Sequence, residues 1–292
     1  MQEAQISKEL LEFVGLYNIM NVLLLDGMNL IHRARSGFAK GDHSIVFSFF
    51  RSLKPIIEKF KPDSVYFVLE GNPRHRKNLL NDYKKNRKSP PDSFWKQKDE
   101  ILNILSMLPI TVIKHPDYEC DDVIANLAKR FSENNNVTVV STDSDFIQLW
   151  DTLNSDNLNL YNPVKKAFVE KPDYCYLDWK AFKGDVSDNI PGIPGVGDKT
   201  ANRLVTDNNF RNSFLSDKEK LLIFERNKEL IKFHWLEQSQ DSEYIINEQN
   251  VSLDNVKNIF KEYDFKSMLN DKYWAKFKLA FENLCASYKI LV

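Results

Sequence analysis

The sequence predicts an α/β protein with a central, mostly parallel sheet and flanking helices, followed by a mainly helical C-terminal region. Two observations support this fold class. Short apolar runs alternate with helical segments up to about residue 140, and strand-like runs fade beyond about residue 178. Alternation of buried strands and helices is typical of a parallel sheet covered by helices. We therefore expect two regions, 1–177 and 178–292.

The expected strands are continuous apolar runs, which is the pattern of strands buried on both faces of a sheet. They cover residues 21–25, 65–69, 110–113 and 137–140. Helical spacing predicts helices over residues 3–17, 43–60, 92–108 and 121–132. Pro55 is expected to kink the second of these. In the C-terminal region we expect short amphipathic helices, broken by Gly and Pro around 191–197. Residues 211–292 carry no motif, and Trp235 and Trp274 are expected in the core.

Composition indicates an ordinary globular protein. The chain has 292 residues, of which 42% are hydrophobic and 28% charged, and its formal net charge is −1. Apolar runs of the ~18 residues that span a membrane are absent from the sequence, and its first residues do not resemble a signal peptide. Cys120, Cys175 and Cys285 follow no disulfide or zinc spacing, so we expect reduced thiols. These features predict a cytoplasmic protein.

Acidic residues follow the expected strands directly. Asp26 comes after the first strand, Glu70 after the second, and Asp143 soon after the strand at 137–140. In open α/β sheets the ligand site lies at the carboxyl ends of the strands. One such residue alone is as well explained by a turn or a helix cap, but together they predict a shared site.

Further acids are grouped around helix starts. Four acids in the six residues 117–122 exceed what helix capping requires. Asp143 and Asp145 are two residues apart, and Asp185 and Asp188 are expected on one helix face. Crowded carboxylates repel one another, and Mg²⁺ or Mn²⁺ removes that repulsion by accepting oxygen ligands. The predicted metal ligands are Asp26, Glu70, Glu119, Asp121, Asp122, Asp143, Asp145, Asp185 and Asp188. Sites of this kind usually handle phosphate chemistry.

A basic stretch follows Glu70. Residues 72–98 contain nine Lys or Arg against two Asp, a net charge of +7. A basic run is often only a solvated surface, but beside an acidic site it favours a polyanionic substrate. Arg74 belongs to this stretch. Tyr83, Phe94 and Trp95 are expected to stack on bases.

A glycine-rich string, GDVSDNIPGIPGVGDKT, occupies residues 184–200. Gly192, Gly195 and Gly197 allow a tight turn whose backbone N–H groups, with the following helix N-terminus, are expected to hold a phosphate. Lys199 is placed to neutralise it.

The chain resembles the 5′-nuclease, or flap endonuclease, superfamily. The motifs LLLDGMN, NDYKKNRKSPP, DYECDDVIA, VVSTDSDF and KGDVSDNIPGIPGVGDKTA occur in that family's order over roughly residues 20–210. The superfamily includes the 5′-nuclease domain of bacterial DNA polymerase I and phage 5′→3′ exonucleases. Because the chain has no polymerase region, it is more similar to phage or stand-alone bacterial members.

The resemblance implies a helical arch over about 72–98 and a helix–three-turn–helix over about 178–210. Asp26, Glu70, Glu119 and Asp121 would surround one metal ion. Asp143, Asp145 and Asp185 would serve a second, with Asp122 and Asp188 assisting. Lys84 and Arg87 match residues that contact the scissile phosphate, and Arg76 matches an arch arginine. The glycine-rich turn would hold duplex phosphates with a potassium ion.

The implied activity is two-metal hydrolysis of DNA near 5′ ends, flaps or gaps, with 5′-phosphate and 3′-hydroxyl products. RNA–DNA hybrids are further candidate substrates, and we expect a monomer that works with replication proteins in a bacterial or phage-infected cell. Two positions depart from the family pattern: Glu70 replaces Asp, and Cys120 replaces Ala. The alternatives are a branched-DNA-binding protein with a degenerate metal site and an RNase that acts on RNA primers.

Overall fold

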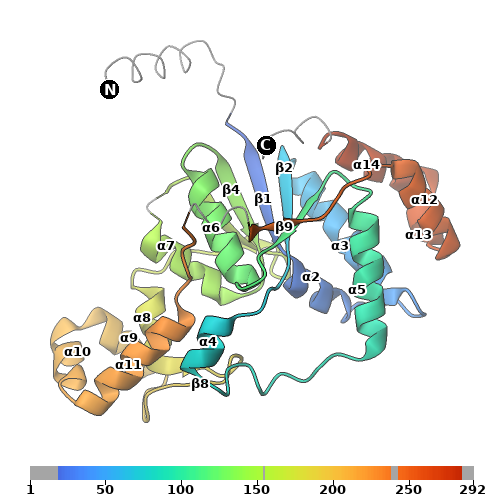
Figure 1. The fold of residues 1–292 in the computed structure, drawn as a ribbon. Coiled ribbons are helices and arrows are strands. Elements are labelled where there is room, and N and C mark those ends of the chain that lie inside the picture. The colour runs from blue at the N-terminus through green and yellow to red at the C-terminus, as the bar shows by residue number, and fades with distance from the viewer. Residues whose placement is uncertain (1–18, 154, 238–242, 285–292) are drawn as a thin grey trace, which may run out of the picture.

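The computed structural model describes residues 19–153, 155–237 and 243–284 (Figure 1). The helix expected over residues 3–17 lies outside these ranges. The centre is a seven-stranded sheet in the order β6-β5-β4-β1-β2-β3-β9. Its five inner strands pair in parallel, and β6 and β9 pair antiparallel at the two edges. The mostly parallel α/β fold class is therefore confirmed.

The four expected strands are present to within one residue. They are β1 (Asn21–Asp26), β2 (Ser64–Val68), β3 (Thr111–Lys114) and β4 (Asn136–Val140). The sequence analysis missed three more, which are β5 (Leu158–Asn162), β6 (Ala167–Phe168) and β9 (Ile245–Ile246). β6 and β9 have two residues each, and all of those are exposed, so they lack an apolar pattern. β5 carries an exposed Asn159 between buried leucines.

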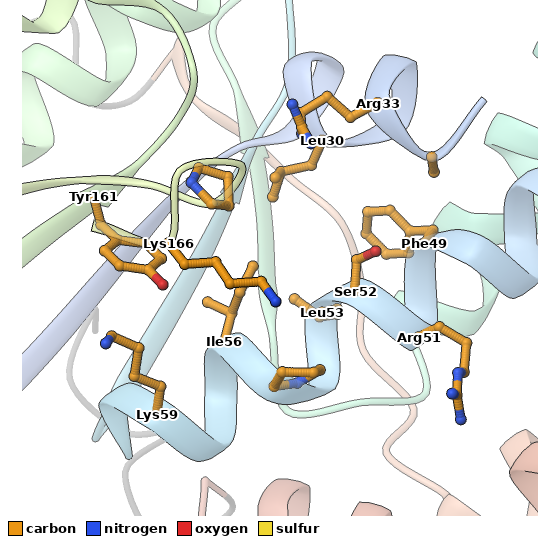
Figure 2. A pocket seen from close by; sticks show the side chains of 13 residues that line it. Leu30, Arg33, Phe49, Arg51, Ser52, Leu53, Ile56, Lys59, Tyr161 and Lys166 are labelled. Atoms are coloured by element: carbon orange, nitrogen blue, oxygen red, sulfur yellow. The ribbon is translucent and has the colours of Figure 1, made fainter. Parts of the chain in front are cut away.

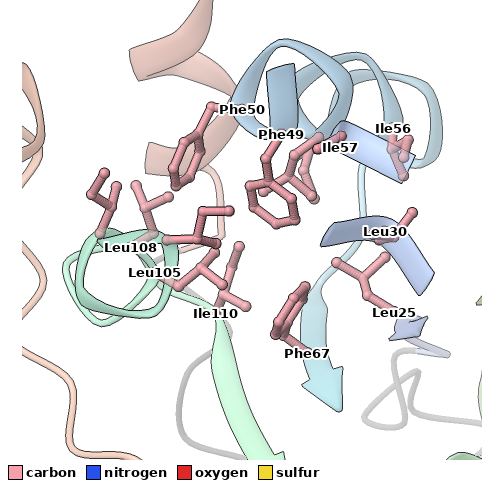
Figure 3. Close-up of a cluster of buried hydrophobic side chains, with 14 of the residues drawn as sticks. Leu25, Leu30, Phe49, Phe50, Ile56, Ile57, Phe67, Leu105, Leu108 and Ile110 are labelled. Carbon is pink, nitrogen blue, oxygen red and sulfur yellow. The ribbon is translucent and has the colours of Figure 1, made fainter. Parts of the chain in front are cut away.

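Helices cover both faces of the sheet because alternate residues of each strand point to opposite sides. On one face, Leu23 and Leu25 pack under α2 (Gly27–Ala34), α3 (Ser44–Phe60) and α5 (Asp92–Leu105). Figure 3 shows Leu25 and Phe67 of the sheet beneath Phe49 and Phe50 of α3. Pro55 lies inside α3, which continues to Phe60 without a break.

The other face of the sheet contributes Val22 and Leu24, which pack under a second set of helical elements. These are α6 (Cys120–Ser132), the 3₁₀ turn η1 (Ser144–Gln148) and α7 (Leu149–Thr152). The apolar runs of the sequence therefore correspond to strands buried from both sides.

A helical lobe lies beside the carboxyl ends of the strands (Figure 1). It contains α8 (Tyr176–Lys183), α9 (Asp198–Thr206), α10 (Asn208–Leu215) and α11 (Lys218–Ile231). Its small core includes Phe182, Leu204 and Phe224. Between α8 and α9 run the short strands β7 (Gly184–Asp185) and β8 (Ile190–Pro191). The lobe is tied to α4 (Arg74–Leu79) at the start of the basic stretch.

The expected shared helix face of Asp185 and Asp188 is wrong. Gly184 ends α8 with a φ of +79°, and Asp185 then lies in β7 and Asp188 in the following turn. A left-handed residue at this position stops a helix, and glycine adopts that conformation without a steric penalty.

The last helices return to the sheet rather than join the lobe. α12 (Leu253–Glu262), α13 (Lys266–Leu269) and α14 (Asp271–Glu282) pack beside α3 (Figure 1). The rings of Phe50 and Phe260 lie 5.5 Å apart. Trp274 is buried in this core as expected, whereas 36% of Trp235 is exposed. Residues 178–231 and 253–284 thus pack in different places, which the single boundary at 178 did not anticipate.

The basic stretch is only partly helical. α4 is followed by turns at 81–86, a connection without regular structure to residue 91, and α5. In the described ranges, none of the helices is long and apolar enough to cross a membrane.

Candidate active site

The carboxyl edge of the sheet opens into a cavity of about 430 Å³. Four of the nine predicted acids line it, together with two of the predicted basic residues, Lys84 and Arg87. The four acids are Asp26, Glu70, Asp121 and Asp143. The structure thus brings together residues that are 117 positions apart in the sequence, as the parallel-sheet argument predicted.

Asp26 is fixed at the end of β1. Its carboxylate accepts hydrogen bonds from Ser141 Oγ (2.6 Å) and from the backbone N–H of Asn29 (3.1 Å), so it also caps α2. The next residue is Gly27, and a larger side chain would not fit there, because a Cβ would lie 2.4 Å from the Val68 carbonyl oxygen. Only 5% of Asp26 is exposed, and this burial raises its pKa to about 6 despite the hydrogen bonds.

The other acids of the cavity also hold protons more tightly than usual. Burial raises the pKa of Asp121 well above its ordinary value, and the charges of Asp143 and Asp26 raise it further. The pKa of Asp143 is raised mainly by burial, against the lowering effect of Lys180. Burial and the carboxylates of Glu119 and Asp26 raise the pKa of Glu70 to about 7. Water still reaches Glu70, whose side chain is 37% exposed.

Glu119 and Asp122 lie behind the cavity at the start of α6. They form a capping box, in which each side chain accepts a hydrogen bond from the other's backbone N–H. Both are bound by Arg76, whose guanidinium lies 2.7 Å from Glu119 and 2.6 Å from Asp122. Burial would lower the pKa of Arg76, but Asp122 and Glu119 raise it overall.

Three side chains of the basic stretch, namely the arginine matched to the arch and two of the rings expected to stack on bases, are buried in this structure. Arg76 is 3% exposed, so it is no surface contact for DNA. Tyr83 is 5% exposed, and its hydroxyl donates to Glu119 (2.8 Å) or Asp188 (3.0 Å), which leaves no ring face for a base. Phe94 is fully buried and stacks on His32. A basic run of sequence does not reveal which of its side chains turn inward.

Lys84 and Arg87 lie where they were expected, on the wall of the cavity. The Lys84 ammonium contacts Glu119 and lies 3.7 Å from Asp188 and 3.9 Å from Glu70. Burial would lower the pKa of Lys84, but these carboxylates raise it overall. Arg87 Nη2 lies 2.5 Å from Asp188. Both cations therefore remain charged beside the acids.

Asp145 and Asp185 form a separate pair around Lys180, a residue that the sequence analysis did not single out. Lys180 Nζ contacts Asp145 and lies 2.7 Å from Asp185 Oδ2. Burial would raise the pKa of Asp185, but Lys180 and Ser187 lower it overall. The sequence could have indicated this contact, because Lys180 lies five residues before Asp185 in the helix that precedes it.

The glycine-rich turn is exposed between β8 and α9. Gly195 has a φ of +80°, and a Cβ at Gly195 or Gly197 would have nothing within 4 Å. Gly192 differs, because a Cβ there would lie 2.0 Å from the Lys183 carbonyl oxygen. Lys199 is exposed in the first turn of α9. On α4, Arg74 is also exposed and pairs with Asp117 at 3.2 Å.

The donor set suits a hard divalent cation, because four oxygen acids share one cavity, where burial first and neighbouring carboxylates second raise their pKa values. A ready-made group of three metal-binding side chains is absent from the described ranges. Instead, the ammonium groups of Lys84 and Lys180 lie among the acids. The residues therefore suit Mg²⁺ or Mn²⁺ by their chemistry. Binding of the ions would require Lys84 and Lys180 to move away from the carboxylates.

A second cavity, of about 520 Å³, lies between α2, α3 and the turn from β5 to β6 (Figure 2). Its lining includes Arg33, Lys59 and Lys166 but no Asp, Glu, His or Cys. It offers no carboxylate, imidazole or thiol to a metal, and the acidic cavity, with four carboxylates, is the candidate active site.

The model of the 5′-3′ exonuclease N-terminal resolvase-like domain matches residues 21–175. This match begins at β1 and includes every acid of the cavity. The chain belongs to the 5′-3′ exonuclease family.

Curated relatives extend the family match. The chain is 32% identical over 203 residues to a 5′-3′ exonuclease of Mycoplasmopsis pulmonis, covering 65% of this chain and 66% of that one. It is 31% identical over 281 residues to a 5′-3′ exonuclease of Aquifex aeolicus, covering 85% and 93%. The chain thus spans about two thirds of the first relative and most of the second.

Among solved structures, the fold is similar to that of a bacteriophage T5 flap endonuclease in complex with DNA and metal ions. The TM-score is 0.57 at 19% identity, and the match covers 72% of this chain and 88% of that one. At this identity the likeness shows the fold alone.

Proposed function

We propose that this protein is a divalent-metal-dependent, structure-specific 5′-nuclease. It would hydrolyse phosphodiester bonds near the 5′ ends of DNA, as a 5′→3′ exonuclease and flap endonuclease. The observation that carries the proposal is the cavity in which Asp26, Asp121 and Asp143 face Lys84 and Arg87. Such a site combines ligands for hard cations with positive groups for a phosphate.

The acids of the cavity would hold the metal. Asp26, Glu70, Asp121 and Asp143 are the proposed direct ligands, and Glu119 supports them from behind. Asp145 and Asp185, now paired with Lys180, would serve a second ion with Asp188 beside them. When bound, a pair of Mg²⁺ or Mn²⁺ ions lowers the pKa of a water molecule and offsets charge on the phosphate.

The chain's own cations would orient the substrate. Lys84 and Arg87 are held at the cavity by Asp188, so they can bind the non-bridging oxygens of the scissile phosphate from one side. Lys84, which contacts Glu119, would turn from it toward that phosphate. The expected products carry a 5′-phosphate and a 3′-hydroxyl.

The exposed glycine-rich turn would bind duplex DNA away from the cut. We infer that α8, the turn and α9 form a helix–three-turn–helix, with a potassium ion among the backbone oxygens of the turn. The support is an open approach to the backbone at Gly195 and Gly197, with Lys199 exposed beside them. Arg74 would add a contact from α4.

The proposed setting is replication or primer removal in the cytoplasm of a bacterial or phage-infected cell. Flaps, gaps and free 5′ ends of DNA, and RNA–DNA hybrids, are the proposed substrates. The protein would act as a monomer with replication proteins. The alternative of a branched-DNA-binding protein with a degenerate site is less well supported, because all nine predicted acids are present.

The proposal is tested with a 5′-flap and a blunt duplex, each labelled at both ends, in Mg²⁺ or EDTA. Magnesium-dependent cleavage by the wild type that Asp143→Asn abolishes is the expected result. The lengths of the products distinguish flap cleavage from exonuclease action. Binding of the flap without cleavage in either Mg²⁺ or Mn²⁺ would replace this proposal with the degenerate-site alternative.

A further inference from the structure

A segment of seven residues, 230–236, leaves the helical lobe and crosses the back of the acidic cavity. We call it the crossing segment. Its backbone is held by polar side chains of the sheet region rather than by a neighbouring strand. Gln148 Nε2 donates to the Ile231 carbonyl oxygen (3.1 Å), and Gln148 Oε1 accepts from the N–H of Phe233 (3.2 Å). Gln148 is 2% exposed.

Helix α6 holds the other half of the crossing segment. Asp122 accepts a hydrogen bond from the N–H of His234 at 2.9 Å. Asn126 donates to the carbonyl oxygen of His234 (2.7 Å) and accepts from the N–H of Leu236 (2.9 Å). These contacts fix the segment against the helix that begins with the cavity acids.

Arg76 joins the crossing segment to those acids. Nε donates to the Leu230 carbonyl oxygen (2.9 Å), and Nη2 donates to the Lys232 carbonyl oxygen (2.9 Å) and to Asp122 Oδ1 (2.7 Å). Nη1 donates to Glu119 Oε2 (2.7 Å) and Asp122 Oδ2 (2.6 Å). A guanidinium has five N–H donors. All five are used here, and none is left for a phosphate.

The other end of the crossing segment reaches the glycine-rich turn through Asn227. This residue of α11 is fully buried, and its amide donates to the carbonyl oxygens of Ala181 (3.0 Å) and Pro191 (2.9 Å). Ala181 belongs to α8 and Pro191 directly precedes Gly192. A continuous chain of buried contacts therefore runs from the turn through α11 and Arg76 to Glu119.

We propose that Arg76 is a positioning residue that fixes Glu119 behind the acidic cavity and couples the cavity to the glycine-rich turn through the crossing segment. This inference rests on the proposed function. Glu119 Oε2 is held by Arg76 while Oε1 faces Lys84. Loss of the Arg76 contact would free the Glu119 carboxylate, and with it the arrangement of acids that receives the metal.

The test compares Arg76→Lys with wild type in two assays that need no turnover. Calorimetric titration with Mn²⁺ reports metal affinity, and fluorescence anisotropy with a 5′-flap in EDTA reports DNA binding. Lysine keeps the charge but cannot bridge five acceptors. We expect Mn²⁺ affinity to fall about tenfold or more, as is typical when a residue that supports a metal ligand is lost. DNA affinity in EDTA should stay within about twofold of wild type.

Two further variants complete the design. Arg74→Lys makes the same substitution at an exposed arginine of α4 and should leave Mn²⁺ affinity unchanged. Asn126→Leu loosens the crossing segment without touching Arg76 or Glu119, and should lower Mn²⁺ affinity by a few-fold. If Arg76→Lys does not fold, the Mn²⁺ affinity of Asn126→Leu tests the proposal by itself.

The inference is overturned if Arg76→Lys loses flap binding in EDTA while Mn²⁺ affinity is kept, because Arg76 would then be a DNA contact. It is also overturned if Arg76→Lys and Asn126→Leu only lower the melting temperature. Failure of the proposed function is distinct, since the wild-type protein would then cut neither substrate.

Discussion

Lys180 and Asp185 lie on opposite sides of the residue that ends α8, yet their charged atoms meet at 2.7 Å. The same ammonium contacts Asp145, which approaches from η1. One cation therefore joins the helical lobe to the turn that follows β4, and it lowers the pKa of Asp185.

Replacing Lys180 with Met should destabilise the metal-free protein. Asp145 and Asp185 would keep their burial and lose their counter-charge, and removal of one partner from a buried pair typically costs about 3–5 kcal/mol. Urea denaturation in EDTA measures the free energy of unfolding. Lys183→Met is the matched control, because its partner Asp198 is exposed and such pairs contribute about 0–1 kcal/mol. Equal losses in the two variants would argue against a special role for Lys180.

Stability without metal should fall as the pH rises from about 4 to 7. The pKa of Asp26 is raised from 3.8 to about 6 and that of Glu70 from 4.5 to about 7. In this window the folded chain binds more protons than the unfolded chain, so the free energy of unfolding decreases with pH. Mg²⁺ binds the ionised carboxylates, and its stabilisation should therefore be larger at pH 8 than at pH 5.5.

Thermal melts at both pH values, with and without Mg²⁺, check this prediction. In Asp26→Asn the dependence of the Mg²⁺ effect on pH should be weaker. A Mg²⁺-induced shift of the same size at both pH values in the wild type would contradict the proposed link between metal and proton.

Two glycines of the same turn should respond differently to alanine. Gly192→Ala places a methyl group 2.0 Å from a backbone oxygen and should cost about 1–3 kcal/mol of stability. Gly197→Ala meets no neighbour within 4 Å, so its stability should lie within about 0.5 kcal/mol of wild type.

DNA binding by Gly197→Ala should nevertheless weaken, because the new methyl group would separate the backbone from a phosphate. Denaturation together with anisotropy on duplex DNA separates the two effects. Unchanged DNA affinity in Gly197→Ala would argue that the turn does not contact the duplex.

Tyr83→Phe tests the buried position of Tyr83. The change removes the hydroxyl that faces Glu119 and Asp188, and should cost about 1–3 kcal/mol because buried acceptors lose their donor. Affinity for single-stranded DNA should be unchanged. A large loss of DNA affinity at unchanged stability would show that the hydroxyl contacts DNA, because phenylalanine keeps the ring. Trp95→Ala is the matched comparison for base stacking. Trp95 is 39% exposed and lines the cavity, so its loss should weaken DNA binding.

Four strands of the sheet, β1 to β4, were predictable because they are apolar runs buried from both sides. Val22 to Leu25 have no solvent side, so their sequence is uniformly apolar. The cavity acids were predictable for a related reason, since Asp26 and Asp143 follow such strands and parallel order brings the strand ends together. The edge strand β9 pairs only Ile245 and Ile246 with β3, and a pattern of two residues cannot be recognised.

The orientation of the basic side chains was not predictable. Arg74 and Arg76 differ only by position on α4, yet the first is exposed and the second has its whole guanidinium inside the protein. What decides between them is the crossing segment, which lies about 155 residues further along the chain. The residues around Arg76 in the sequence do not indicate a partner that lies so far along the chain.

The return of α12, α13 and α14 to the sheet has a consequence for synthesis of the chain. Phe50 of α3 shares a hydrophobic core with Phe277 and Phe281, so one side of α3 is not covered until α12, α13 and α14 have been synthesised. A nascent chain that ends after the glycine-rich turn would contain the family's motifs but present an open apolar surface. The yield of folded protein should therefore depend on chaperones that bind this surface during synthesis, even after all the motifs have been made.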